Sequence, residues 1–223
     1  MRKARRVSRH IDKGFEAPPV GWSVASYDPN ALLDAFPSLR MRNGFQMAGY
    51  QFYDGANASG FVFAIPEDQC LPAPHEGFGL ELSANGIATL SSKDEPTPEW
   101  IRPDIGSFLE GDGSPLSFFQ AAIFIRELQE MGSFWHGCSW STHEVITSAT
   151  QIAKQKWEWK ETQPGDWRPV VCQISAGLWQ VVFYSHTGLG REQIVIHKDT
   201  FTEGYQFDPD EEVIALGEGG YVF

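Results

Sequence analysis

Residues 114–132 read Ser-Pro-Leu-Ser-Phe-Phe-Gln-Ala-Ala-Ile-Phe-Ile-Arg-Glu-Leu-Gln-Glu-Met-Gly, and this stretch decides the fold. Ser114 is a suitable helix N-cap, and Pro115 suits the first turn, where a missing N–H costs nothing. Gly132 is typical of a helix end. Between them, apolar residues recur at helical spacing: Phe118, Ala121, Ala122, Ile125 and Leu128. The stretch therefore predicts a central helix.

A second helix is expected to begin at Ser141. Ser141 and Glu144 have the spacing of a capping box, in which each side chain bonds to the backbone amide of the other residue. Trp140 and Val145 are placed to form the hydrophobic staple that often accompanies it. The buried stripe of this helix would consist of Val145, Ala149, Ile152 and Ala153.

Strand patterns flank the two helices on both sides. Before them, residues 45–53 and 61–65 surround a turn-rich loop, and residues 77–83 lead into the turn-forming pair Asn85-Gly86. After them, alternating or apolar segments follow at 157–160, 169–174, 178–184, 193–197 and 213–216. This order predicts the α+β class, with mostly antiparallel β-sheet in N-terminal hairpins and a C-terminal meander, packed with two central α-helices.

The charge of the chain is distributed unevenly. The 223 residues carry a net charge of −12, but the first 13 residues carry +5 and the remainder −17. We interpret residues 1–20 as a flexible basic arm and residues 21–223 as a single α+β domain, with 91–113 as an alternative place to divide it. An acidic body repels nucleic acid, so we expect no nucleic-acid partner. The opposed charges of arm and body would suit a homo-oligomer.

Cysteine use and hydropathy indicate the compartment. The chain has three widely separated cysteines, an odd number that argues against a disulfide framework and for a reducing environment: Cys70, Cys138 and Cys172. The longest uncharged apolar stretch, residues 121–125, is far shorter than the roughly 20 residues that cross a bilayer. The basic start is followed by polar residues, so we expect no secretory signal. The expected location is the cytoplasm, without membrane contact.

The densest group of chemically active side chains lies just before the second helix, where residues 134–144 contain Trp135, His136, Cys138, Trp140 and His143. A thiol ahead of a helix N-terminus would be stabilised as a thiolate, with a lowered pKa, and a histidine beside it could accept its proton. The candidate catalytic residues are therefore Cys138, His136 and His143. The alternative interpretation is a buried cysteine that packs as a small apolar side chain, with histidines bonded to the backbone.

The same group could bind zinc. Three ligands would come from His136, Cys138 and His143, and a fourth would come from His186, His197 or Cys172. However, this spacing matches neither a paired-cysteine motif nor the HExxH motif. We therefore expect no metal site and no cofactor.

The tryptophans suggest an aromatic-lined pocket. Six of the eight lie between positions 135 and 179, and flat rings of this kind stack on sugars, bases or cations. The candidate ligand-binding residues are Trp135, Trp140, Trp157, Trp159 and Trp167. Close packing between the sheet and the helices would explain the same rings without a ligand.

Three functional classes follow from these features. We expect a soluble, non-catalytic module that binds a small molecule or a protein through an aromatic-lined pocket near residues 133–144. The alternative is a thiol- or metal-dependent hydrolase or transferase that uses Cys138 with His136 or His143. A third class, a component of an assembly, would use the charge contrast between arm and body.

Overall fold

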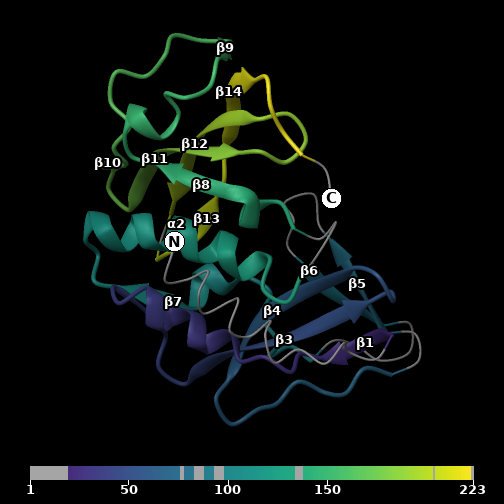
Figure 1. Ribbon diagram of the computed structural model, residues 1–223. Helices are drawn as coiled ribbons and strands as arrows, with labels where there is room; N and C mark the ends of the chain where they lie inside the picture. Colours follow the sequence, from purple (N-terminus) through teal and green to yellow (C-terminus); the bar gives the residue numbers. More distant parts are fainter. Residues whose placement is uncertain are drawn as a thin grey trace.

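The computed structural model describes residues 20–75, 78–82, 88–92, 98–133, 138–202 and 204–221. Over this part of the chain the predicted α+β class is confirmed, because antiparallel strands predominate and pack against a helix. Figure 1 shows helix α2 (Pro115–Gln129) between a C-terminal sheet above it and N-terminal strands below it. Among the described helices, none is both long enough and apolar enough to cross a membrane.

The larger sheet contains the strands of the predicted C-terminal meander and, in addition, residues 143–146, which were expected to be helical. Its strands are β8 (His143–Ile146), β9 (Trp157–Trp159), β10 (Val170–Ser175), β11 (Leu178–Thr187), β12 (Gln193–Phe201), β13 (Phe207–Asp208) and β14 (Glu211–Gly217). Within the described residues the main path runs β10-β11-β12-β14-β9, and every pair is antiparallel. Strand β8 pairs with the second half of β11, beyond the residues that pair with β10, and β13 pairs with β12.

The N-terminal strands form the predicted hairpins. Strands β1 (Gly21–Val24), β3 (Phe45–Tyr53) and β4 (Ala58–Pro66) make one antiparallel sheet, and two smaller pairs accompany it, β2 (Leu39–Met41) with β7 (Leu109–Gly111) and β5 (Phe78–Leu82) with β6 (Ala88–Ser92). The Asn85-Gly86 turn expected between β5 and β6 lies outside the described residues. Two 3-10 helices, η1 (Pro29–Ala35) and η2 (Ile105–Phe108), connect these strands.

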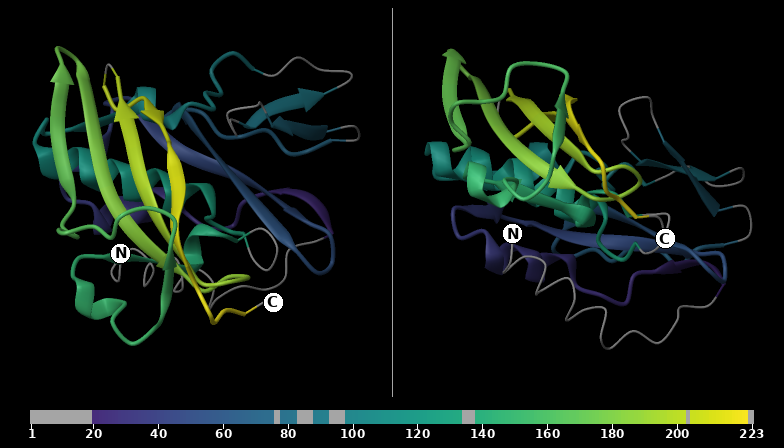
Figure 2. Two further views of the ribbon diagram at one scale, coloured as in Figure 1. Left: turned by 90° about the horizontal axis from the view of Figure 1, so that it is seen from above. Right: turned by 45° about the horizontal axis from the view of Figure 1, so that its top comes forward.

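Helix α2 is covered by sheet on opposite sides (Figure 2). Its predicted cap is present, because Ser114 Oγ accepts a hydrogen bond from the amide of Ser117. All five residues from Ala121 to Ile125 are buried, and consecutive residues point to every side of a helix. One apolar cluster joins the helix to both sheets, and Met47, Phe124 and Phe183 are among its members. The helix is therefore the middle layer of the fold.

The prediction of a second α-helix from Ser141 is wrong. Residues Trp140–Thr142 form a single 3-10 turn, η4, after which the chain continues as β8, and a further turn, η5, covers Ala149–Gln151. The Glu130 carboxylate accepts hydrogen bonds from the amides of Ser139, Trp140 and Ser141. It thereby occupies the Ser141 amide that Glu144 was expected to bind. Pairing of β8 with β11 then outweighs the local helix signal.

The C-terminal end of α2 is locked against the N-terminal sheet. Tyr27 Oη donates a hydrogen bond to the Met131 carbonyl at 2.8 Å, and Gln51 Nε2 donates to the Gly132 carbonyl at 2.6 Å. Gly60 in β4 passes so close to this helix end that an added Cβ would lie 1.8 Å from the Met131 oxygen. The position of the chain that leads into η4 is therefore determined by the N-terminal half of the fold.

Gly60→Ala is expected to lower the free energy of unfolding by about 2–3 kcal/mol, because the new methyl group would collide with the Met131 carbonyl. Gly165→Ala is the matched control, since an added Cβ there meets nothing within 4 Å, and its effect should stay within about 0.5 kcal/mol. Urea unfolding followed by tryptophan fluorescence measures both variants. Equal stabilities of the two variants would contradict the close approach.

Candidate functional site

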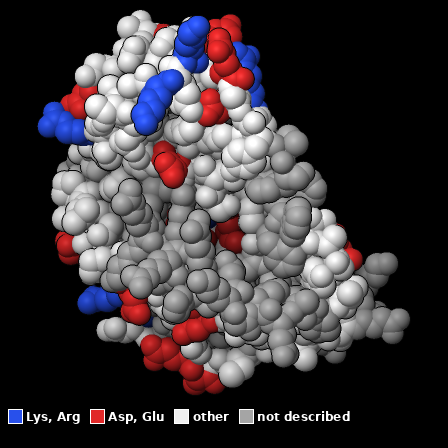
Figure 3. Space-filling model, in the orientation of Figure 1, with Lys and Arg blue, Asp and Glu red and all other residues white. Residues whose placement is uncertain are grey.

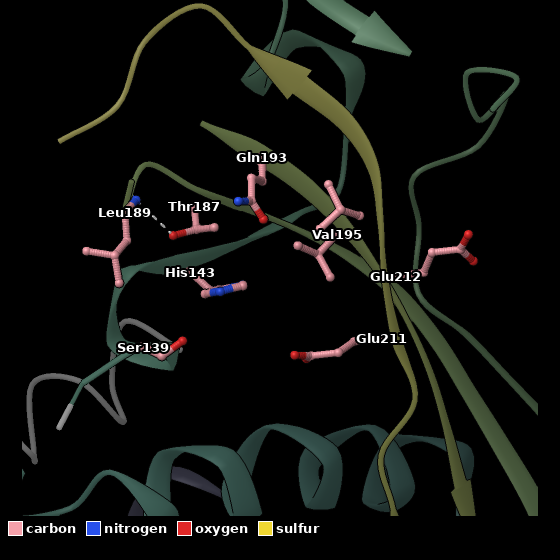
Figure 4. Close-up of a pocket in the computed structure, with 9 residues that line it drawn as sticks. Ser139, His143, Thr187, Leu189, Gln193, Val195, Glu211 and Glu212 are labelled. Atoms are coloured by element: carbon pink, nitrogen blue, oxygen red, sulfur yellow. Dashed lines mark hydrogen bonds between the residues drawn. The ribbon is translucent and has the colours of Figure 1, made fainter. Parts of the chain in front are cut away.

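A pocket of about 260 Å³ opens where η4 and β8 meet the ends of β11, β12 and β14. In Figure 4, Glu211 extends from β14 into the space below His143, whereas its neighbour Glu212 extends to the other side of the strand. The lining combines hydroxyl, amide, imidazole and carboxylate groups with aliphatic side chains: Ser139, His143, Thr187, Leu189, Gln193, Val195, Glu211, Glu212 and Val213.

A β-bulge determines which glutamate faces the pocket. The pairing of β12 with β14 shifts in register between Ile194 and Val195. One extra residue in a strand exchanges the two faces of the strand beyond it, because side chains alternate from one face to the other. As a result, Glu211 rather than Glu212 lies opposite His197, and the two side chains share a face of the sheet.

Three neighbouring strands carry a buried hydrogen-bonded chain beside the pocket. His143 Nδ1 on β8 lies 2.8 Å from Ser185 Oγ on β11, and the same Oγ lies 2.7 Å from His197 Nε2 on β12. Ser185 and His197 have no exposed surface, and His143 is 8% exposed. The register places His143 opposite Thr187 and His197 opposite Phe183, so Ser185 comes between the two imidazoles on the inner face.

A buried ion pair ties this chain to α2. Arg126 donates to both oxygens of Asp199, at 2.6 and 2.7 Å, and their side chains are 6% and 0% exposed. The guanidinium carbon lies 5.4, 5.5 and 5.0 Å from the ring centres of Trp140, Phe183 and Phe207. Burial raises the pKa of the Asp199 carboxyl, and the guanidinium opposes that shift. Each charge is thus compensated by two short hydrogen bonds where water is excluded.

Two charged groups meet at Nδ1 of His197. Arg126 Nη2 lies 3.2 Å from it, and Glu211 Oε2 lies 3.4 Å from it. Burial lowers the pKa of His197, although the contact with Glu211 acts in the opposite direction. The same contact lowers the pKa of Glu211. At neutral pH the imidazole is therefore uncharged, while Glu211 carries a negative charge at the pocket.

Of the predicted ligand-binding tryptophans, Trp140 lies at this site. Its ring stacks on His143 with centroids 5.2 Å apart, and its Nε1 donates to the buried Glu127 carboxylate at 3.1 Å. A separate apolar cluster, which includes Ile146, Ile194 and Ile214, contains Trp167, and Trp157 and Trp159 pack against it. Trp135 lies outside the described residues. The structure therefore places the predicted tryptophans in two different regions.

Of the predicted catalytic residues, His143 belongs to the site just described. Cys138 is half-buried, and its Sγ donates to the Ser133 carbonyl at 3.1 Å. Because a 3-10 turn and then a strand follow Cys138, the helix terminus that we expected to stabilise its thiolate is not formed there. His136 lies outside the described residues.

The residues considered as further metal ligands lie in three different places. His197 is buried in the hydrogen-bonded chain, and its ring centre is 6.0 Å from that of His143. His186 follows Ser185 in β11, so it points to the opposite face, where its Nε2 lies 3.7 Å from Glu192. Cys172 is exposed on β10. Among the described residues, no three His, Cys, Asp or Glu side chains form a group that could hold a metal ion.

Sequence reasoning missed most of the polar network. It did not single out Arg126, Ser185, Asp199 or Glu211, and it considered His197 only as a metal ligand. A signal was nevertheless present, because polar residues at alternate positions of an apolar strand point into the core together. His197 and Asp199 are two residues apart in β12 and both are fully buried. Such a pair needs buried polar partners.

Asp199→Asn should lower the free energy of unfolding by about 3–5 kcal/mol, because it leaves the buried Arg126 guanidinium without its counterion. The double variant Arg126→Met/Asp199→Leu removes both charges and should recover much of this loss. The exposed pair Arg168–Asp166 has the same 2.6 Å separation, so Asp166→Asn is the matched control and should cost far less, because solvent screens an exposed ion pair. Chemical denaturation compares the three variants. Equal losses for Asp199→Asn and Asp166→Asn would contradict the role of burial.

Acid should destabilise the protein in part through His197. Its pKa is lowered below the unfolded value of 6.5, so below pH 6.5 the unfolded state binds more protons than the folded state. The corresponding stabilisation is complete above pH 6.5 and is lost as the pH falls through 6.5 toward the folded pKa. His197→Gln should therefore flatten the decline in unfolding free energy between neutral pH and about pH 5. An unchanged pH slope in this variant would contradict a buried, neutral imidazole.

No protein-family model matches the chain, and neither the curated proteins nor the solved structures compared with it include a significant match. The function is therefore inferred from the chemistry of the pocket and of the polar network beside it.

Proposed function

We propose that the pocket binds a small molecule that carries a cationic nitrogen, as an ammonium or guanidinium group. The observation that carries this proposal is the Glu211 carboxylate, which extends into the pocket with 60% of its side chain exposed. Its pKa is lowered by the contact with His197, so it is ionised at neutral pH. The same contact, at 3.4 Å, orients one carboxylate oxygen. A cation at this carboxylate gains charge-assisted hydrogen bonds, which are stronger than neutral ones.

The rest of the lining supports binding of a small, partly apolar molecule. Ser139, Thr187 and Gln193 can form hydrogen bonds, and aliphatic surface comes from Leu189, Val195 and Val213. A volume of about 260 Å³ lies below the range of roughly 300–1,000 Å³ in which proteins enclose drug-sized ligands. The pocket therefore suits a small amine or guanidine rather than a nucleotide.

The charges around the pocket favour a cation over an anion. The Glu211 carboxylate extends into the pocket, and the lining residues that the structure describes include no lysine or arginine. Arg126, the nearby buried cation, is already matched by Asp199. Lys198 bonds to Glu212 at 3.3 Å, on the side of β14 away from Glu211. On the face seen in Figure 3, acidic side chains lie both in the middle and at the edges, and no Lys or Arg side chain is visible in the middle.

The aromatic residue next to this pocket is Trp140, which packs behind the lining residue His143. Trp140 stacks on His143 and is itself 7% exposed, so it supports the imidazole rather than offering its own face to a ligand.

The thiol-dependent alternative has less support, because the Cys138 thiol donates to the Ser133 carbonyl and does not precede an α-helix. A non-catalytic binding role at Glu211 is thus the function that the geometry favours.

Titration with methylguanidinium, ethylammonium, acetate and glycerol, followed by amide chemical shifts, tests this proposal. The two cations should perturb residues of the pocket, and acetate and glycerol should not. Glu211→Gln should weaken cation binding about 10- to 100-fold, because a hydrogen bond to a charged group contributes roughly 1.5–3 kcal/mol.

Glu144→Gln is the control for the loss of one negative charge. Glu144 is exposed beside His143 on β8, but it lies opposite His186 and so faces the other side of the sheet. Its replacement should change cation binding less than about twofold, as expected for a solvent-screened charge. The proposal would be contradicted if the two variants weakened cation binding equally. It would also be contradicted if acetate alone changed the amide chemical shifts of the pocket residues.

A further inference from the structure

The polar and aliphatic residues of the pocket follow an order that the strands determine. Along β12, Gln193, Val195 and His197 point to the same inner face, because they are two residues apart. The pairing with β14 places Val213 opposite Val195 and Glu211 opposite His197. Figure 4 likewise shows Val195 between Gln193 and Glu211. The pocket therefore has a carboxylate at one end, an aliphatic pair in the middle and the Gln193 amide at the other end.

The side-chain amide of Gln193 is available to a ligand. Gln193 is half-buried, and no hydrogen bond to its side chain is formed within the part of the chain that the structure describes. Among these residues, His186 is the one with a buried side-chain nitrogen or oxygen that lacks a partner. The unbonded amide atoms of Gln193 therefore reach solvent. An amide has an acceptor oxygen and a donor nitrogen, so this end of the pocket can bond to a ligand in both directions.

The surroundings of Gln193 favour a neutral group over a charged one. Its cross-strand neighbours are Thr187 on β11 and Leu216 on β14, and neither carries a charge. The Thr187 hydroxyl is already occupied, because it lies 2.6 Å from Thr142 Oγ1 and accepts from the Leu189 amide at 3.2 Å. A neutral amide on the ligand matches both the donor and the acceptor of Gln193. A carboxylate would leave the Gln193 oxygen without a donor, and an ammonium would leave its nitrogen without an acceptor.

The strand geometry determines how far apart the two polar ends lie. Gln193 and His197, the residue opposite Glu211, are four positions apart in β12, which corresponds to roughly 13 Å at about 3.3 Å per residue. Side chains stand roughly perpendicular to a sheet, so their polar tips have a similar spacing. A hydrogen bond of about 2.9 Å at each end leaves roughly 7 Å between the two groups of the ligand. An extended chain of about four to five methylene groups spans this distance at roughly 1.2 Å per bond.

We propose that the pocket binds a small molecule in which a primary amine is joined through about four to five methylene groups to a neutral amide. The ammonium group bonds to Glu211, and the methylene chain lies against Val195 and Val213. The amide of the ligand pairs with the carboxamide of Gln193. This inference rests on the cation binding proposed above, and it adds the length of the ligand and the group at its far end.

The middle of the pocket favours a ligand with an apolar centre. Its surface there comes from aliphatic side chains, Leu189, Val195 and Val213. Each methylene group that leaves water for such a surface adds to the affinity. A polar group at the same place would lose its water without gaining a partner from these three side chains.

Titration of the full-length protein with N-acetylated diamines of increasing length, from ethylenediamine to hexamethylenediamine, tests the inference. Amide chemical shifts give the affinities. Pentylammonium is the reference ligand, because it has the cation and the chain but no amide. N-acetylputrescine or N-acetylcadaverine should bind most tightly, about tenfold more tightly than pentylammonium, as expected for two neutral hydrogen bonds. ε-Aminocaproate, which has a carboxylate in place of the amide, should bind more weakly than N-acetylcadaverine.

Substitutions at Gln193 test whether it is the partner of the amide. Gln193→Leu should reduce the ratio of the N-acetylcadaverine and pentylammonium affinities to about one. Gln173→Leu is the matched control and should leave this ratio as in the wild type, because Gln173 is exposed on β10 and is not among the residues that line the pocket. Gln193→Glu places a second carboxylate at the neutral end. Unacetylated cadaverine, a dication, should then bind more tightly than N-acetylcadaverine.

The lysine side chain of a peptide has the same spacing between an amine and an amide, so Nα-acetyl-lysine methylamide is included in the titration. Tighter binding of this branched compound than of N-acetylcadaverine would identify a peptide as the source of the amine. Weaker binding would identify a free, unbranched molecule.

The inference would be overturned if acetylated diamines of every length bound no more tightly than pentylammonium, or if Gln193→Leu kept the preference for the amide. In either case, binding of pentylammonium itself would leave the proposed function standing. If neither pentylammonium nor any acetylated diamine perturbed the pocket, the proposed function would fail and the inference with it. If Gln193→Leu fails to fold, the length series and ε-aminocaproate with the wild type decide the question.

Discussion

The bidentate bond between Arg126 and Asp199 is the interaction on which the rest of the site depends. It joins the middle layer of the fold to β12, and both side chains are almost completely buried there. Two buried charges tolerate little misalignment, because each unpaired ion would cost several kcal/mol. The rotation of α2 about its own axis is thereby determined relative to the large sheet. With that rotation set, Nη2 of Arg126 comes to lie 3.2 Å from His197, and the polar groups beside the pocket acquire their positions.

The sheet contributes a second constraint, which is the alternation of its side chains. Residues two positions apart in a strand face the same side of the sheet. This brings two pairs to the inner face: Ser185 and Thr187 on β11, and His197 and Asp199 on β12. The bulge in β14 then brings Glu211 to the same face. Without the bulge, Glu212 would lie opposite His197. A single extra residue therefore decides which carboxylate accompanies the imidazole.

Much of the fold follows from local sequence, whereas little of the site does. Alternation and turn residues suffice for β3, β4 and the meander, and Ser114 marks the start of α2 correctly. The helix expected from Ser141 is not formed, because the carboxylate of Glu130, the residue after α2, binds the Ser141 amide across a separation of 11 residues. Local rules such as the capping box take no account of a competitor of this kind.

The site depends on pairings between distant segments. His143 stood out in the sequence because it lies in a patch of reactive side chains, but its partner Ser185 is 42 residues away. Their meeting depends on the register of β8 against β11, and a shift of one residue would turn every side chain of a strand to the opposite face. No periodicity within a single segment contains that information. Arg126 was hidden for a related reason, since arginine on a helix normally marks a solvated face.

The alanines in the centre of α2 have a consequence for the pocket. Ala121 and Ala122 have no exposed surface, and Figure 2 shows their helix between the two sheets. Small side chains there act as spacers, because they decide how near the helix axis can come to β10 and β11. A larger side chain would widen that gap by a fraction of an ångström, and hydrogen bonds weaken steeply over such distances. The positions of the polar groups beside the pocket thus also depend on small residues of α2 that are not among the residues lining it.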